Sequence, residues 1–213
     1  MRPRITALAL ALSLGVAAPA NASTPFTLLS AGSTTAFGYF VGPYTGLQGT
    51  TNVTMNCVDF FHHAVVGDVW QANLTSLGSS AGIGTVTRFN SLAAYRLAAW
   101  LSTQYTPAMD AATVGDIQAT IWNLFSGPVT PPSPSTNIWL TAAQNYVAAN
   151  PTSALWQYAY VVTDVNARNA DGSDNVHSEQ EFLVVSTPEP ASMMLMGTGL
   201  LGLAAFGARR KRK

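Results

Sequence analysis

An uncharged apolar run near the end of the chain, residues 191–208, constrains how this sequence can fold. A run of about 18 apolar residues is long enough to cross a bilayer as a helix, and glycine is tolerated in such helices. Five basic residues follow the run directly: Arg209, Arg210, Lys211, Arg212 and Lys213. By the positive-inside rule, these cations hold that end on the cytoplasmic side. We therefore predict a C-terminal transmembrane helix with a basic membrane stop.

A short, stiff segment made of Pro188, Glu189 and Pro190 precedes the apolar run. The order Pro-Glu-Pro, apolar helix and basic end resembles the PEP-CTERM sorting signal of Gram-negative bacteria. The resemblance implies an exosortase-type processing enzyme in the inner membrane as a partner, and delivery to the cell surface or the exopolysaccharide matrix. It concerns the destination of the protein and leaves its activity open.

The beginning of the chain has the pattern of a secretory signal peptide. Arg2 and Arg4 form a positive region, an apolar stretch follows over residues 5–16, and Ala-Asn-Ala at residues 20–22 is a typical cleavage site. We predict Sec-type export and cleavage after Ala22. The expected organisation is a signal peptide over 1–22, one exported domain over 23–187 and the sorting signal over 188–213. The C-terminal helix is expected to anchor the protein until it is processed.

The charge of the predicted exported domain differs from the neutral balance of the whole chain. Most basic residues lie in the two terminal segments, and only Arg88, Arg96 and Arg168 lie between them. Nine of the ten acidic residues lie in the same part, so the domain is acidic and contains no lysine. Without a basic patch, nucleic-acid binding is not expected.

Strand patterns lie on both sides of the middle of the domain. Residues 51–61 alternate with a period of two, which places Cys57 and Asp59 on the same face. The other segments with strand patterns are residues 65–73, 84–89, 155–165 and 181–185.

Helical patterns fill the middle of the domain. The pair Asn90-Ser91 can cap a first helix, and Asp110 can cap a second one that extends over residues 111–125. A third helix is predicted over residues 137–149, and it ends before Pro151. The order of strands, helices and strands predicts an α+β fold, with a β-sandwich or barrel-like sheet that carries an insertion of about three helices.

Two residues are unusual for a plain structural core. Cys57 is the single cysteine of the chain, so it is a buried thiol, an intermolecular link or a reactive group. Gln118 lies on the same predicted helical stripe as Ile121 and Trp122. A buried amide is costly unless it is hydrogen-bonded, so Gln118 is expected to have a partner or to have reacted.

These residues lie in motifs that resemble the thioester domains of bacterial surface proteins. The motifs are Asn-Cys-Val-Asp at residues 56–59, Tyr-Arg-Leu-Ala-Ala-Trp-Leu at 95–101 and Ile-Gln-Ala-Thr-Ile-Trp at 117–122. In that family a cysteine thiol and a glutamine side-chain carbonyl join as an internal thioester with loss of ammonia. The resemblance implies Cys57 and Gln118 as the bonded pair. Ile117 and Thr120 depart from the family, which has Thr and Ala there, and neither change removes a reacting atom.

The resemblance also implies covalent adhesion by a reaction that each molecule performs once. Asp59, His62 and His63 are the candidate groups for proton transfer, and Trp100 and Trp122 are expected to help exclude water. A surface or exopolysaccharide that bears an amine or a hydroxyl would attack the Gln118 carbonyl. We expect no turnover, hence no enzyme, and no cofactor.

Other functions fit the same residues. The main alternative is a passive structural or carbohydrate-associated matrix protein in which Cys57 is inert. A hydrolase that pairs Cys57 with His177 has no support from spacing alone. Adjacent His62 and His63 point in opposite directions on a strand and lack an evident third ligand, so no metal site is expected. A masked thiol favours the thioester, and a free thiol favours the passive protein.

Overall fold

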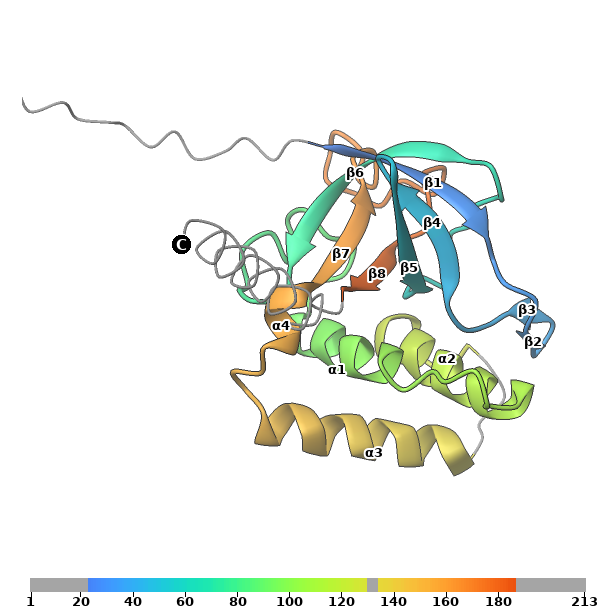
Figure 1. Cartoon of the computed structure of the whole chain (residues 1–213). Coiled ribbons are helices and arrows are strands. Elements are labelled where there is room, and N and C mark those ends of the chain that lie inside the picture. The colour runs from blue at the N-terminus through green and yellow to red at the C-terminus, as the bar shows by residue number, and fades with distance from the viewer. Residues whose placement is uncertain (1–22, 130–133, 187–213) are drawn as a thin grey trace, which may run out of the picture.

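The computed structural model describes residues 23–129 and 134–186, and its centre is a closed six-stranded barrel (Figure 1). The strands follow the order β1-β4-β5-β8-β7-β6, and all neighbours are antiparallel. Their bounds are Thr24–Ser30 (β1), Tyr44–Gln48 (β4), Thr51–Cys57 (β5), Val69–Ser76 (β6), Ala159–Asp164 (β7) and Phe182–Val185 (β8). A two-stranded hairpin, β2 (Thr35–Ala36) and β3 (Tyr39–Phe40), lies between β1 and β4 in the chain. The expected barrel-like sheet is confirmed.

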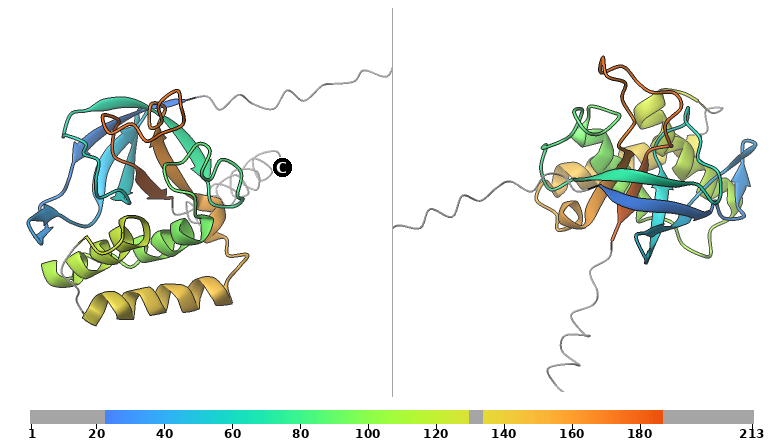
Figure 2. Two further views of the ribbon diagram at one scale, coloured as in Figure 1. Left: turned by 180° about the vertical axis from the view of Figure 1, so that it is seen from behind. Right: turned by 90° about the horizontal axis from the view of Figure 1, so that it is seen from above.

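The helices form an insertion between β6 and β7. They are α1 (Leu92–Ser102), α2 (Ala111–Ser126), α3 (Pro134–Ala149) and the short α4 (Leu155–Tyr158). Helices α1 and α2 lie across one end of the barrel, and α3 packs against both of them on the far side (Figures 1 and 2). The predicted caps are confirmed, because the side chains of Ser91 and Asp110 accept hydrogen bonds from the backbone of Ala94 and Thr113.

Two apolar clusters hold these layers together. One fills the barrel with side chains from all six strands and is closed at the helical end by Val114 and Trp122 of α2. The other lies between the barrel and the helices. Strands β7 and β8 contribute to both, since neighbours such as Val161 and Val162 point to opposite faces. These strands are therefore apolar on both faces.

Two strand predictions are wrong for local reasons. Residues 84–89 form turns, because Gly82 and Gly84 adopt positive φ and the Thr87 hydroxyl accepts from Gly84 N and donates to Phe89 O. Residues 155–158 form α4, and the predicted strand begins only at Ala159.

The boundaries of two further strands also differ from the expectation. Strand β5 ends at Cys57, because the Asp59 carboxylate accepts hydrogen bonds from the backbone of Phe61 and His62 and turns the chain. Cys57 and Asp59 therefore do not share a strand face, which corrects the predicted alternation. Strand β6 occupies Val69–Ser76 instead of 65–73.

The predicted signal peptide and C-terminal transmembrane helix lie outside the described residues. Within residues 23–129 and 134–186, none of the helices combines the length and the apolar character that a membrane crossing requires.

A buried carboxylate directly before β8 joins the barrel to the helices. Glu181 is fully buried, and one of its oxygens accepts from Arg88 N at 2.8 Å and from the Thr163 hydroxyl at 2.6 Å. The other oxygen accepts from the Tyr95 hydroxyl at 2.5 Å. Burial raises the pKa of Glu181 to about 7, although these donors act in the opposite direction. Below about pH 7 the protonated form is therefore favoured in the folded state.

The stability of the protein should fall as the pH rises from about 4.5 to about 7. The pKa of Glu181 is higher in the folded than in the unfolded state, so the folded state binds more protons in this window. The expected loss in unfolding free energy is roughly 2–3 kcal/mol. Urea unfolding at pH 5 and pH 8 measures it.

Glu181→Gln should flatten this pH dependence, because its amide oxygen can accept from Arg88 and Thr163 while its amino group donates to Tyr95. The control is Glu179→Gln, which removes a half-buried neighbouring carboxylate and should keep most of the decline. An unchanged slope in Glu181→Gln would contradict the assignment.

Candidate functional site

Cys57 lies where the barrel meets the helical layer. It is the last residue of β5, pairs with Phe182 of β8 and belongs to the apolar cluster inside the barrel. Its exposed fraction is 0%. The sulfur is therefore held in a dry environment, as a reactive acyl group would require.

Helix α2 brings the predicted partner residues to Cys57. Gln118 and Trp122 are four residues apart, so they lie on the same helix face. The Gln118 amide nitrogen donates to the Cys57 backbone oxygen at 2.8 Å, and the Trp122 indole nitrogen donates to the Cys57 sulfur at 3.2 Å. The structure thus places the two sequence-predicted residues in contact and gives the buried amide the partner it needs.

The Cys57 thiol is strongly held in its protonated form. Burial raises its pKa to about 12, the nearby charge of Asp59 acts in the same direction, and the hydrogen bond from Trp122 opposes the shift. The thiol lies 3.1 Å from the Asp59 backbone oxygen, to which it donates. A reaction at this sulfur therefore needs a route for its proton.

Three aromatic side chains, Trp122, Phe60 and Tyr39, pack together beside the Cys57 sulfur. The Trp122 ring packs edge-on against Phe60 at 5.1 Å and Tyr39 at 6.1 Å between ring centroids. A pocket of about 140 Å³ lies at this surface, lined by Ala31, Tyr39, Phe40, Tyr44, Phe60, His63, Ala64, Trp122 and Gln180. These rings lie between the sulfur and the surface on this side. Trp100 lies elsewhere, because it stacks on Tyr146 at 5.6 Å and packs against the cluster between the barrel and the helices.

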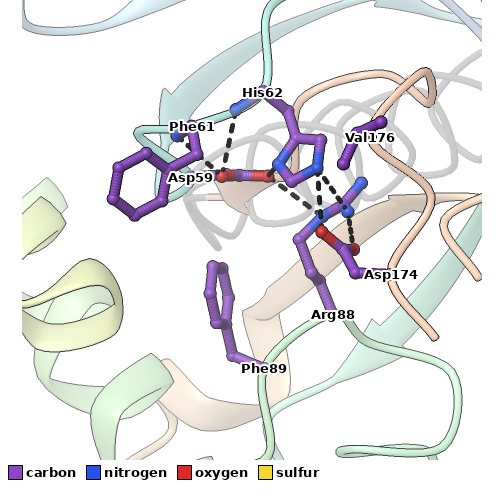
Figure 3. Close-up of a pocket in the computed structure, with 7 residues that line it drawn as sticks. All are labelled: Asp59, Phe61, His62, Arg88, Phe89, Asp174 and Val176. Atoms are coloured by element: carbon purple, nitrogen blue, oxygen red, sulfur yellow. Dashed lines mark hydrogen bonds and ion pairs between the residues drawn. The ribbon is translucent and has the colours of Figure 1, made fainter.

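The predicted proton-transfer groups are directed elsewhere. Asp59 faces His62 at 2.7 Å and Arg88 at 3.0 Å, and His62 also contacts Asp174 at 3.0 Å (Figure 3). His63 is exposed. Within the described part of the chain, no hydrogen bond joins a side chain of Asp59, His62 or His63 to the Cys57 sulfur.

This charged cluster lines a pocket of about 340 Å³ together with Phe61, Phe89 and Val176 (Figure 3). The Arg88 guanidinium pairs with Asp59 and Asp174 and also donates to Ser178 and the Glu179 backbone oxygen. Because these donors are occupied, the cluster serves to fix the chain and leaves no free cation for an anionic ligand. No metal-binding group of three or more His, Cys, Asp or Glu side chains occurs among the residues described.

Two residues important to this region were not identified as site residues from the sequence. The Tyr105 hydroxyl donates to the Gln118 side-chain oxygen at 3.1 Å, and Arg88 organises the turn after Cys57. Tyr105 lies in the loop between α1 and α2, where no periodic pattern marks it. His177 is exposed on its loop, whereas Cys57 is fully buried, so the structure does not bring that alternative pair together.

Comparison with protein families finds a PEP-CTERM protein-sorting motif at residues 186–212. The chain therefore carries the signal of exosortase substrates, which implies a membrane-anchored precursor that is processed for export to the cell surface. No curated protein and no solved structure matches the chain. The resemblance of residues 52–125 to thioester domains accordingly stays a prediction.

Proposed function

We propose that this exported surface protein attaches covalently to its target through an internal thioester between Cys57 and Gln118. The observation that carries the proposal is the contact of the Gln118 amide nitrogen with the Cys57 backbone at 2.8 Å, inside a fully buried site. The aromatic cover formed by Tyr39, Phe60 and Trp122 supports it, because a thioester must be kept from water.

Formation of the bond needs no external reactant. The Cys57 sulfur attacks the side-chain carbonyl carbon of Gln118, which forms a C–S bond and breaks the C–N bond. The thiol proton passes to the departing nitrogen, which leaves as ammonia. Direct transfer of this proton fits the site, since the thiol is protonated and its present acceptor is a backbone oxygen that cannot keep a proton.

The later attachment step uses an amine or a hydroxyl on the partner, such as an exopolysaccharide or another surface polymer. The nucleophile adds to the Gln118 carbonyl, the C–S bond breaks, and Cys57 regains a proton. Each molecule reacts once, so this is adhesion without turnover. The absence of lysine between the two terminal segments agrees with a thioester that is not consumed by its own chain.

The second candidate is a passive matrix protein with an inert cysteine. The raised pKa of Cys57, about 12, favours it, because an ordinary buried thiol in this environment is unreactive. The two candidates differ in one chemical property, namely whether a thiol exists in the native protein.

The mature protein purified from its host should be lighter than its sequence by one ammonia. Methylamine treatment should add one methylamine at Gln118, and Cys57→Ala should show neither change. Intact-mass and peptide-mass measurements test this directly.

Gln118→Glu should also lack the ammonia loss, whereas Gln144→Glu, at an exposed position of α3, should keep it. A wild-type mass equal to that of the unmodified sequence would refute the thioester and leave the passive protein.

Thiol titration after denaturation should separate the two candidates independently. The thioester protein should show no thiol until methylamine is added, while the passive protein should show one. In a native protein with a free Cys57, a pKa near 12 should slow alkylation at pH 8 about a thousandfold relative to an ordinary cysteine, because little thiolate is present. Rapid alkylation of the native protein would contradict the burial of the sulfur.

Replacing Pro188, Glu189 and Pro190 by alanine should block processing of the sorting motif. The expected result is a full-length precursor in the membrane fraction, detected with an antibody against the exported domain. Asp171→Ala, a surface change outside the motif, should leave processing intact. Normal release of the alanine variant would show that this segment is not needed for recognition.

A further inference from the structure

The hydrogen bond between Tyr105 and Gln118 points to a role that the thioester pair alone does not explain. The Tyr105 hydroxyl donates to the Gln118 side-chain oxygen at 3.1 Å, while the nitrogen of the same amide donates to Cys57. The Gln118 amide is therefore held at both of its polar atoms, and its carbonyl carbon is the atom that would react.

The carbonyl oxygen is where negative charge develops in both steps of the proposed chemistry. Attack by the Cys57 sulfur gives a tetrahedral intermediate with charge on this oxygen, and so does attack by an external amine or hydroxyl. A donor that is already aimed at such an oxygen stabilises the transition state more than the ground state. The Tyr105 hydroxyl occupies that position.

The surroundings of Tyr105 keep it available as a donor. Burial raises its pKa well above the usual value for tyrosine, and the nearby charges of Cys57 and Tyr44 act in the same direction. The hydroxyl therefore keeps its proton at neutral pH. Tyr44 directs its own hydroxyl to the Phe40 backbone oxygen at 3.2 Å, so it does not compete for Gln118.

Tyr105 also connects the buried amide to an opening on the surface. It lines a pocket of about 440 Å³ between the segment that precedes β4 and the loop before α2, together with Val41, Pro43, Met109 and Val114. The lining has no charged side chain. This pocket lies on the Tyr105 side of the amide, whereas the aromatic pocket lies on the Trp122 side.

We propose that Tyr105 is a catalytic residue of the thioester reaction, and that its hydroxyl stabilises the charge on the Gln118 oxygen when the bond forms and when a nucleophile opens it. This proposal rests on the proposed function, because without a thioester Tyr105 only satisfies a buried amide. The role of Tyr105 adds no reactant to the nucleophile that opens the thioester: the proton balance is that of the formation and opening steps, and Tyr105 donates a hydrogen bond without losing its proton.

The test compares wild-type protein, Tyr105→Phe and Tyr146→Phe, each produced as the full chain in the host. Methylamine is the probe, and release of the Cys57 thiol gives the opening rate. Removal of one oxyanion donor typically lowers the rate by a factor of about 10²–10³, so the thioester of Tyr105→Phe should open more slowly by that factor. Tyr146→Phe removes a hydroxyl that contacts Ser153 instead and should behave as wild type.

The possible results distinguish a failure of the proposed thioester function from a failure of the proposed role of Tyr105. A wild-type protein without a thioester overturns the proposed function and the role of Tyr105 with it. If the wild type carries a thioester and the thioester of Tyr105→Phe opens at the same rate, only the role of Tyr105 is overturned. A folded Tyr105→Phe protein that carries a free Cys57 and an unreacted Gln118 supports the role at the formation step.

A second replacement keeps the test valid if Tyr105→Phe fails to fold. A fluorotyrosine in place of Tyr105 retains the ring and gives a more acidic hydroxyl, which is a stronger hydrogen-bond donor. The thioester of this variant should open at least as fast as that of the wild type. Opening at a clearly lower rate with the fold intact would contradict the proposal.

Discussion

The buried carboxylate of Glu181 is the constraint on which the arrangement of barrel and helices depends. It accepts hydrogen bonds from Tyr95 of α1, from Thr163 of β7 and from the backbone of Arg88, which lies in the segment between β6 and α1. An unpartnered carboxyl group in the core would cost several kcal/mol, so these three segments must meet for the fold to be stable. The helical layer is therefore attached to the barrel by a specific polar contact as well as by apolar packing.

Arg88 extends this constraint to the neighbourhood of the cysteine. Its backbone binds Glu181, while its side chain pairs with Asp59 in the turn after β5. The Asp59 backbone oxygen then accepts from both the Cys57 thiol and the Gln180 amide at 2.8 Å. The ion pair between Arg88 and Asp59 thus holds the turn whose backbone oxygen accepts the hydrogen bond of the Cys57 thiol. The charge of Asp59 also acts on Cys57, because it contributes to the raised pKa of the thiol.

The sequence predicted the features of this fold that depend on local rules. The caps at Ser91 and Asp110 follow from side-chain hydrogen bonds within one turn, and a partner for Gln118 follows from the cost of a buried amide. The strand predicted at residues 84–89 was wrong, because the positive φ of Gly82 and Gly84 imposes turns there that a strand pattern does not reveal. Tyr105 was missed as a site residue because it lies in the loop between α1 and α2, where no periodic pattern marks it. Arg88 was missed because its role depends on a contact with Glu181, which lies far away in the chain.

The place of β8 as the last strand of the barrel determines how a pulling force would enter the domain. The last strand, β8, lies between β5 and β7, Ser186 still bonds to the Tyr158 backbone at 2.9 Å, and the sorting motif begins at that same residue. A tether at this end would pull directly on a barrel strand that is hydrogen-bonded to β5 on one side and to β7 on the other. If the opposite anchor is Gln118, the force runs through the junction of α2 with the barrel. Survival under tension is then set by the rate at which that junction opens, and equilibrium stability matters less.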